Sequence, residues 1–140
     1  MNKIIRTASL GCLLLAGGSC IKTKTTPSIV AGTWEIRSSQ ISIIPPVIYP
    51  AGNDSLLKFT NTNYSIYSKG QLVKTGTYTI LNVATSPVQN ASAPLFSHQI
   101  IYDGNTDAKS YVLVSGNKMT FEEGDMEVDA GIVTEYEKLP

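Results

Sequence analysis

The alternation of apolar and polar residues after residue 31 is the feature that most constrains the fold. Short stretches rich in Tyr, Ile, Val, Thr and Phe are separated by clusters of Gly, Asn, Asp and Ser. No window sustains the i, i+3, i+4, i+7 spacing of an amphipathic helix, so the pattern predicts strands. Eight are expected, at about residues 32–43, 55–61, 63–68, 71–82, 95–103, 109–115, 117–122 and 131–138.

A period of two within these strands predicts which residues share the face toward the core. The expected core pairs are Trp34 and Ile36, Leu57 and Phe59, Tyr64 and Ile66, Tyr78 and Ile80, Ile100 and Tyr102, Tyr111 and Leu113, Met119 and Phe121, and Thr134 and Tyr136. The alternate positions are mostly polar, as in a sheet with one face in water. They include Glu35, Arg37, Lys58, Thr77, Thr79, Lys118, Glu135 and Glu137.

The links between strands indicate how the strands are paired. Lys69-Gly70 and Gly116-Asn117 lie between closely spaced strands, where glycine can take the positive φ of a tight hairpin. Such short links predict antiparallel neighbours. The predicted fold is therefore all-β, an eight-stranded antiparallel up-and-down β-barrel, whose closure leaves no exposed edge strand.

The first twenty residues form a separate segment. Lys3 and Arg6 precede the apolar run Leu10–Ala16, and small residues lead into Cys20. The run is far shorter than the roughly 20 residues that span a bilayer, which favours a signal peptide over a transmembrane helix. The segment resembles the export signal of bacterial lipoproteins, in which a cysteine after the cleavage site receives diacylglycerol. Cys12 lies too early to leave a full apolar region, so Cys20 is the expected acceptor.

This resemblance implies a domain organisation and a location. Residues 1–19 would be the signal peptide, residues 20–30 a lipidated tether, and residues 31–140 the barrel domain. The acylated Cys20 would hold the protein to the lipid bilayer as an outer-membrane lipoprotein of a bacterial cell envelope. The segment after Cys20 lacks the acidic run that some surface-exposed lipoproteins carry, so the domain is expected to face the periplasm.

Charge and cysteine content exclude several function classes. Of the eleven basic residues, Lys3 and Arg6 leave with the signal, and the remaining nine face eleven acidic ones, a net charge of −2. We expect no nucleic-acid binding from such a balance. Cys12 leaves with the signal and Cys20 would carry lipid, so the domain keeps no thiol for a disulfide, for thiolate catalysis or for zinc. The 121 residues from Cys20 to Pro140 fit one domain, expected to be a monomer.

The sequence shows no catalytic constellation, and we expect no enzyme, no cofactor and no metal site. His98 is the only histidine, and no nucleophile-elbow pattern marks a serine partner for it. A packed or rim histidine held by a hydrogen bond is the expected role. Glu135 and Glu137 lie about 6.7 Å apart by strand rise, a separation that a glycosidase pair could use. They are instead expected to face solvent, because Thr134 and Tyr136 fill the other face.

Two short motifs have more than one interpretation. The acidic stretch Glu122–Asp129 places Asp125, Glu127 and Asp129 at alternate positions, where a loop could hold calcium. Its spacing does not match an EF-hand, and a solvated hairpin connection is the favoured interpretation. Asp54-Ser55-Leu56 matches a short O-glycosylation pattern, against the favoured interpretation of an ordinary turn at the start of a strand.

The segment 43–50 combines three prolines with large apolar residues, among them Ile44, Val47, Ile48 and Tyr49. Prolines oppose regular strand hydrogen bonding. An apolar loop has to cover something. It is expected to be a cap over the barrel's own core, or else a lid over a ligand mouth or a docking patch for another protein. Of these, the cap is favoured.

The order of several motifs resembles the lipocalin-like domains of Bacteroidetes lipoproteins. The motifs are Gly32-Thr33-Trp34, Leu57-Lys58-Phe59, Tyr64-Ser65-Ile66-Tyr67, Gly76-Thr77-Tyr78-Thr79-Ile80, Met119-Thr120-Phe121 and residues 131–138. The resemblance implies that Trp34 closes one end of the barrel and that the connection after the first strand lies at the open end. The residues it suggests for ligand binding are Trp34, Ile48, Tyr49, Phe59, Tyr64, Tyr78, His98, Tyr102 and Tyr136.

Two function classes remain open. As a binding module, the protein would take a small apolar or amphipathic molecule at the barrel mouth. As a non-enzymatic interaction or structural protein, it would have a barrel filled by its own side chains and dock an envelope protein through residues 43–50. The filling of the barrel distinguishes them, because eight strands enclose either a packed interior or room for one small ligand.

Overall fold

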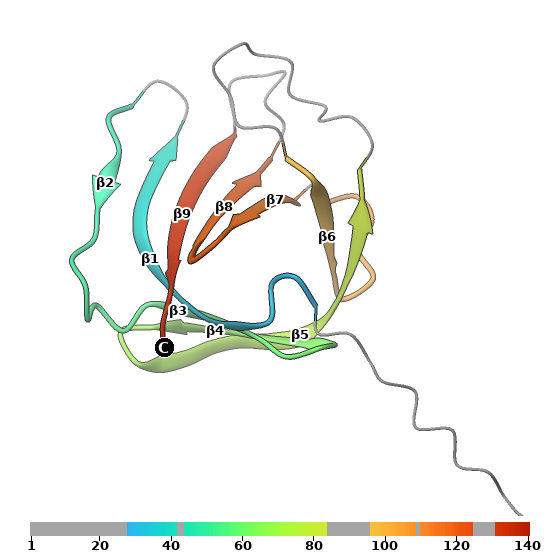
Figure 1. The fold of residues 1–140 in the computed structure, drawn as a ribbon, viewed down its shortest axis with the longest axis horizontal. Helices are drawn as coiled ribbons and strands as arrows, with labels where there is room; N and C mark the ends of the chain where they lie inside the picture. Colours follow the sequence, from blue (N-terminus) through green and yellow to red (C-terminus); the bar gives the residue numbers. More distant parts are fainter. Residues whose placement is uncertain (1–27, 42–43, 84–95, 109, 125–130) are drawn as a thin grey trace, which may run out of the picture.

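Strands account for the regular structure that the computed structural model describes, over residues 28–41, 44–83, 96–108, 110–124 and 131–140 (Figure 1). No helix occurs in these ranges, and so none of them holds a helix able to cross a membrane. The strands are β1 Gly32–Ile41, β2 Val47–Ile48, β3 Leu56–Phe59, β4 Asn63–Ser68, β5 Gln71–Asn82, β6 His98–Tyr102, β7 Ser110–Ser115, β8 Lys118–Glu123 and β9 Ile132–Lys138.

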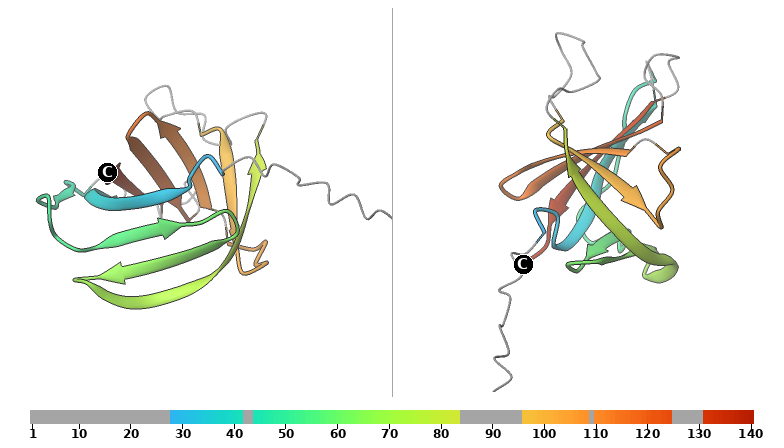
Figure 2. Two further views of the ribbon diagram at one scale, coloured as in Figure 1. Left: turned by 60° about the horizontal axis from the view of Figure 1, so that its bottom comes forward. Right: turned by 90° about the vertical axis from the view of Figure 1, so that its right-hand side faces the viewer.

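A closed barrel of eight antiparallel strands is formed by β1 and β3 to β9. Each strand pairs with the next along the chain, and β9 returns to pair with β1 from Trp34↔Lys138 to Ile41↔Ile132. Figure 2 shows β3, β4 and β5 forming one side of the barrel, with β6 to β9 and β1 forming the rest of the wall. The predicted fold class is therefore confirmed.

The sequence predicts a loop at residues 43–50, but the structure forms the short strand β2 there. Val47 and Ile48 pair with Ser39 and Ser38 of β1, despite the prolines on either side. The Tyr49 amide also donates to the Arg37 carbonyl at 2.8 Å. The pairing is possible because the prolines flank the two residues and leave their amides free to donate.

One end of the barrel, which we call the base, is closed around Trp34. The indole Nε1 donates to the Val30 carbonyl at 2.7 Å, and both side chains are fully buried. The Lys138 ammonium lies 5.2 Å from the centre of the Trp34 ring system, from the last strand. Gly32, with a φ of 137°, leaves room for the Lys138 side chain to pass. The core that follows consists of Leu57, Phe59, Tyr64, Tyr78, Ile100, Val112, Met119 and Phe121.

The opposite end, which we call the mouth, holds the ends of β4, β6 and β8. At the first of these, Lys69 and Gly70 have φ values of 50° and 77°, as the predicted tight hairpin requires. Glu123 ends β8 at the mouth, opposite Ile132. Because successive strands alternate in direction, the start of β1 and the end of β9 lie together at the base.

The face of β7 that points into the barrel is the opposite of the one predicted, which was the face of Tyr111 and Leu113. Val112 is fully buried and Ser110 nearly so, whereas Tyr111 lies on the outer face and packs at 6.5 Å against Phe96. Apolar residues occupy both parities of this strand, so its own sequence does not fix the face. The register with β6 does, because Ile100 pairs with Ser110.

Glu35 is a second correction, since an alternate position expected to be solvated is only 3% exposed. The turn at residues 50–54 covers it on the outer face of β1, and the Gly52 and Asp54 amides donate to its carboxylate at 3.1 and 3.3 Å. Arg37 donates to the same carboxylate and, at 2.8 Å, to Glu137. The Arg37 hydrogen bond keeps the pKa of Glu35 below its usual range.

Several predictions concern residues outside the described ranges. The signal segment, Cys20 and most of the tether belong to this group, as do Asp125, Glu127 and Asp129 of the acidic stretch. The lipidation and calcium hypotheses therefore stay predictions.

Candidate functional site

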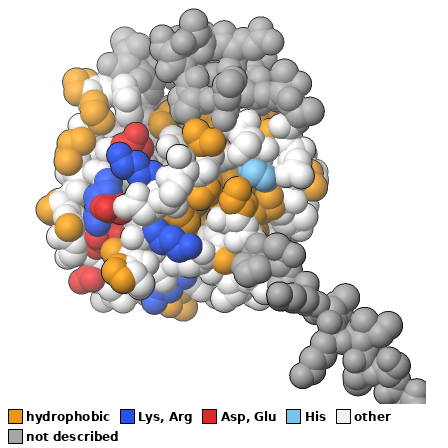
Figure 3. Space-filling view, viewed as in Figure 1, with side chains coloured by type: hydrophobic (Ala, Val, Ile, Leu, Met, Phe, Trp, Pro, Cys, Tyr) orange, Lys and Arg blue, Asp and Glu red, His pale blue; other side chains and the backbone are white. Residues whose placement is uncertain are grey.

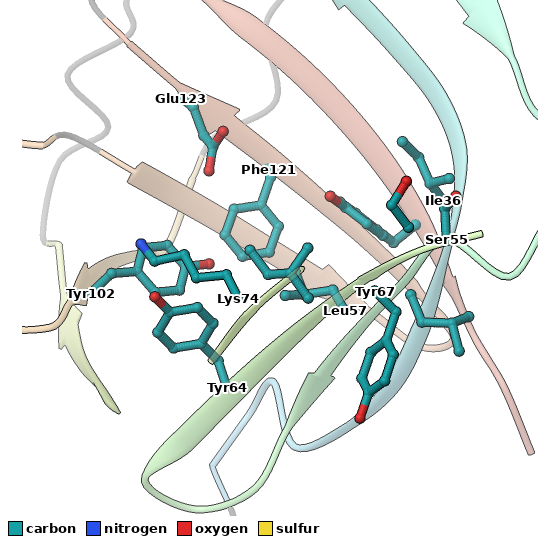
Figure 4. A pocket seen from close by; sticks show the side chains of 13 residues that line it. Ile36, Ser55, Leu57, Tyr64, Tyr67, Lys74, Tyr102, Phe121 and Glu123 are labelled. Carbon is teal, nitrogen blue, oxygen red and sulfur yellow. The ribbon is translucent and has the colours of Figure 1, made fainter. Parts of the chain in front are cut away.

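The barrel interior holds a cavity of about 310 Å³ near the mouth, which we call the chamber. Figure 4 shows side chains from most of the strands around it. Those from β1, β3 and β4 that face the interior are aliphatic or aromatic. Strands β6, β8 and β9 contribute Tyr102, Phe121 and Tyr136, and β8 also contributes Glu123. The lining residues are Ile36, Ser55, Leu56, Leu57, Tyr64, Ile66, Tyr67, Ser68, Lys74, Tyr102, Phe121, Glu123 and Tyr136.

The aromatic wall consists of two edge-to-face pairs. The rings of Tyr64 and Tyr102 lie 4.6 Å apart at 64°, and those of Phe121 and Tyr136 lie 5.9 Å apart at 76°. Removal from water raises the pKa of the Tyr102 and Tyr136 hydroxyls far above the usual tyrosine value. Both phenols therefore stay neutral at physiological pH and can donate hydrogen bonds inside the barrel.

A charged network borders the chamber on the β5 side. The Tyr64 hydroxyl donates to Asp103 at 2.7 Å, and the Thr77 amide donates to the other carboxylate oxygen at 2.9 Å. The Lys74 ammonium lies 3.6 Å from the same carboxylate and 5.5 Å from the centre of the Tyr64 ring. The hydrogen bond from Tyr64, followed by that from Thr77, lowers the pKa of Asp103. The Lys74 charge is thus balanced within the protein.

Gly76 makes this network possible. It lies opposite Tyr64 in the pairing of β4 with β5. A Cβ at this position would collide with the Asp103 carboxylate and with the Tyr64 ring. A glycine inside a strand often marks such a close approach.

Glu123 lies on the other side of the chamber, at the end of β8 (Figure 4). It shares the inward face with Phe121, and it pairs across the sheet with Ser110 on one side and Ile132 on the other. No hydrogen bond or ion pair engages its carboxylate within the described ranges. Partial burial raises the pKa of Glu123, while Lys74 partly offsets that rise.

A more open recess of about 650 Å³, which we call the vestibule, adjoins the chamber. Lys74, Tyr102 and Glu123 line both spaces and form the neck between them. Beyond the neck, most of the lining residues have polar side chains, and the turn after β6 contributes most of them. Its other residues are Asp103, Asn105, Asp107, Ala108, Ser110 and Gly124.

The structure divides the nine residues suggested for ligand binding into three groups. Tyr64, Tyr102 and Tyr136 line the chamber. Trp34, Phe59 and Tyr78 instead fill the core toward the base, where Phe59 and Tyr78 are in edge contact at 4.9 Å. The remaining three, Ile48, Tyr49 and His98, are not among the residues that line the chamber.

Ile48 and Tyr49 line a separate groove of about 420 Å³ on the outer face of β1 and β9. Ile44, Val47 and Ile48 are 58%, 57% and 70% exposed, so the segment does not cap the barrel's own core, contrary to the favoured interpretation. Hydrophobic side chains are visible at this margin of the molecule in Figure 3, where Figure 1 places β2. The cap prediction failed because β2 extends the sheet beside β1 instead of folding over the open end.

His98 lines a shallow recess together with Ser28, Ile29 and Asn82, and its Nδ1 lies 2.7 Å from the Ser97 hydroxyl. This matches the expected histidine held by a hydrogen bond. Glu135 and Glu137 lie on the outer face as expected, where they bind Ser38 and Arg37. Ser55, in the glycosylation pattern, has its amide bonded to the Asn53 side chain in a turn before β3.

The sequence analysis missed Lys74, Asp103 and Glu123. The parity of the strands carried a signal for two of them, because Lys74 shares a face with Gly76 and Tyr78, and Glu123 shares one with Phe121. Asp103 is brought to the site by the fold alone. Glu122, expected to be solvated, is only 1% exposed on the outer face, and one of its carboxylate oxygens has no hydrogen-bond partner among the described residues.

Among the described residues, no three His, Cys, Asp or Glu side chains come together as a metal site would require. Comparison with protein-family models, with curated proteins and with solved structures gave no match for this chain. The case for function therefore comes from the chamber, the neck and the vestibule.

Proposed function

We propose that this protein is a binding module that takes one small amphipathic molecule, with the apolar part in the chamber and the polar part in the vestibule. The single observation that carries the proposal is the chamber of about 310 Å³ with its aromatic and aliphatic lining. Its volume is at the lower end of the range for small-molecule sites. At about 30 Å³ for a water-sized group, it accommodates roughly ten non-hydrogen atoms.

The lining supports binding and gives no support to a reaction. Tyr102 and Tyr136 offer neutral hydroxyls among aromatic rings, and the rings supply apolar contact area at little conformational cost. Apolar surface buried by a ligand contributes roughly 25 cal/mol per Å² before the cost of association is subtracted. The chamber lies at the mouth of a β-barrel, a place where binding sites recur.

We further propose that the protein is a lipocalin-like lipoprotein, with Cys20 anchored in the bacterial outer membrane. The motif order described above and the eight-stranded barrel support this assignment. Cys20→Ser tests the anchor, because loss of the acyl chains removes about 0.8 kcal/mol of membrane affinity per buried methylene. The variant should leave the membrane fraction or remain unprocessed. An unchanged membrane fraction with a normal N-terminus would contradict the anchor without touching the binding proposal.

Ile66→Trp tests the binding proposal, because the larger ring enters the chamber from β4. Ile101→Trp is the matched control, since Ile101 alternates with the inward-facing Ile100 on β6. Octan-1-ol, a neutral probe with nine non-hydrogen atoms, should bind the natural chain and the control in calorimetry but not the Ile66→Trp variant. Equal binding by all three proteins would sink the proposal.

A second candidate function is docking of an envelope protein through the exposed segment. The observation that favours it is the exposure of Val47 and Ile48 beside the outer groove. Crosslinking from position 48 in cells, compared with crosslinking from Lys118 on the same barrel, would test it. A partner captured only from position 48 would support docking, and identical profiles would contradict it.

A further inference from the structure

The charges at the neck are not equally satisfied. Lys74 has Asp103 within 3.6 Å, and Asp103 in turn accepts from Tyr64 and Thr77. This cation is therefore compensated inside the protein. Glu123 faces it across the neck, with no hydrogen bond or ion pair to any described residue. Glu123 is exposed at the neck, where its carboxylate lies beside the apolar wall of the chamber. A cation that enters the neck is attracted to this carboxylate more strongly than it would be in bulk water, because the apolar wall lowers the local dielectric.

The surroundings of Glu123 are those that a ligand ammonium prefers. Tyr102, Phe121 and Tyr136 line the same space, and the electron-rich faces of aromatic rings attract cations. The vestibule adds Asp103 and Asp107 to Glu123, against Lys74 alone among its described charged residues. A carboxylate ligand would meet this excess of negative charge, and its natural partner Lys74 is already engaged.

Within the proposed binding function, we infer that the neck selects a ligand with an ammonium group. Glu123 meets the cation, and the apolar part of the ligand fills the chamber. The class of ligand is a primary or substituted amine with an apolar portion of roughly ten non-hydrogen atoms or fewer. Fatty acids and other amphipathic anions are disfavoured by the same arrangement.

Three probes with one chain length isolate the charge: octylamine, octan-1-ol and octanoate. Titration calorimetry on the full-length chain at neutral pH and low salt should give octylamine roughly tenfold tighter binding than octan-1-ol, with octanoate weakest. Glu123→Gln should reduce octylamine affinity to about that of octan-1-ol and leave octan-1-ol binding unchanged. Glu135→Gln, which removes an equal charge on the outer face, should change none of the three affinities.

The outcomes distinguish this inference from the binding proposal. If octan-1-ol binds but octylamine binds no tighter, or if Glu123→Gln leaves octylamine affinity unchanged, ammonium selection is wrong and the binding module stands. Octanoate as the tightest ligand, lost in Lys74→Met, would assign the selection to Lys74 instead. If none of the three probes binds, the binding proposal and the ammonium inference are both overturned.

Discussion

The Tyr64 hydroxyl donates a 2.7 Å hydrogen bond to the Asp103 carboxylate, and so joins β4 to the turn after β6 beside the chamber. Strand β5 lies between these two elements and pairs with β6 only from Tyr78 onward. The Asp103 amide adds one backbone hydrogen bond, to the Thr77 carbonyl at 2.9 Å. The Tyr64 hydroxyl therefore helps to hold the barrel wall together just beyond the last ladder pair of β5 and β6. The contact also positions Asp103 beside Lys74, one of the three residues of the neck.

Tyr64→Phe should release that turn. The hydrogen bond from Tyr64 is the largest cause of the lowered pKa of Asp103, so the pKa should rise toward the ordinary aspartate value in the variant. Carboxyl carbon shifts followed by NMR across acid pH measure it. Tyr67→Phe, on the same strand at a ring that Lys58 contacts, should leave the Asp103 pKa where it is. A lowered Asp103 pKa retained in Tyr64→Phe would show that Thr77 and Lys74 suffice.

Gly76→Ala should destabilise the barrel by about 1–3 kcal/mol, because the added methyl collides with Asp103 and Tyr64. Urea unfolding monitored by circular dichroism measures the change. The double variant Gly76→Ala with Asp103→Ala should recover part of the loss, since truncation at residue 103 removes one of the two collisions. Absence of any recovery would mean that the ring of Tyr64 dominates the conflict.

Glu35→Gln should reduce the free energy of unfolding at neutral pH by about 1–3 kcal/mol, because the amide replaces a carboxylate that holds Arg37 and the Gly52 and Asp54 amides. The pKa of Glu35 is lowered in the folded state, so its contribution is present above the ordinary glutamate pKa. It is lost as the pH falls through the lowered value. Thermal melts from pH 7 to pH 2 should show the two proteins converging.

Trp34→Ala should cost about 3–5 kcal/mol, because the indole is fully buried at the base and bonded to Val30. Trp34→Phe retains a ring but loses the donor, and should cost less. Chemical denaturation of both variants gives the comparison. A near-neutral effect of the alanine substitution would contradict the role of Trp34 in closing the base.

Replacement of Val47 and Ile48 by Ser should leave the melting temperature nearly unchanged, because both side chains are more than half exposed. Replacement of Leu57 by Ser, at a buried core position, supplies the contrast in the same scanning calorimetry experiment. A large loss of stability from the Val47 and Ile48 pair would mean that β2 shields apolar surface after all.

The architecture and the closed base could be predicted from the sequence because they depend on local period and on tight turns. Trp34, Ile100 and Phe121 stand out by parity in their strands, and Lys69-Gly70 identifies a hairpin. Tyr111 and Val112 could not be assigned in this way, since an apolar residue occupies each parity of β7. Their faces are decided by the register with β6, a long-range pairing.

The aromatic half of the site could be anticipated, but the charged half could not. Tyr64, Tyr102 and Tyr136 are large residues on the predicted inward face of their strands, so the sequence places them among the binding candidates. Lys74 and Glu123 also fall on the inward face of their strands. A charged side chain, however, is normally predicted to face solvent. At the end of a barrel a side chain can point inward and still reach water, and only the closed structure shows which strand ends lie there.

The position of the two chain ends at the base determines which way the mouth of the barrel would face. The chain enters β1 next to Trp34, and the Leu139 amide donates to the Thr33 carbonyl at 2.8 Å, so both ends of the domain meet at the face remote from Glu123. A tether joined at the base would hold the domain with its mouth directed away from the point of attachment. If the protein is anchored and binds a ligand as proposed, the ligand would then be exchanged with the surrounding compartment and not drawn directly from the membrane.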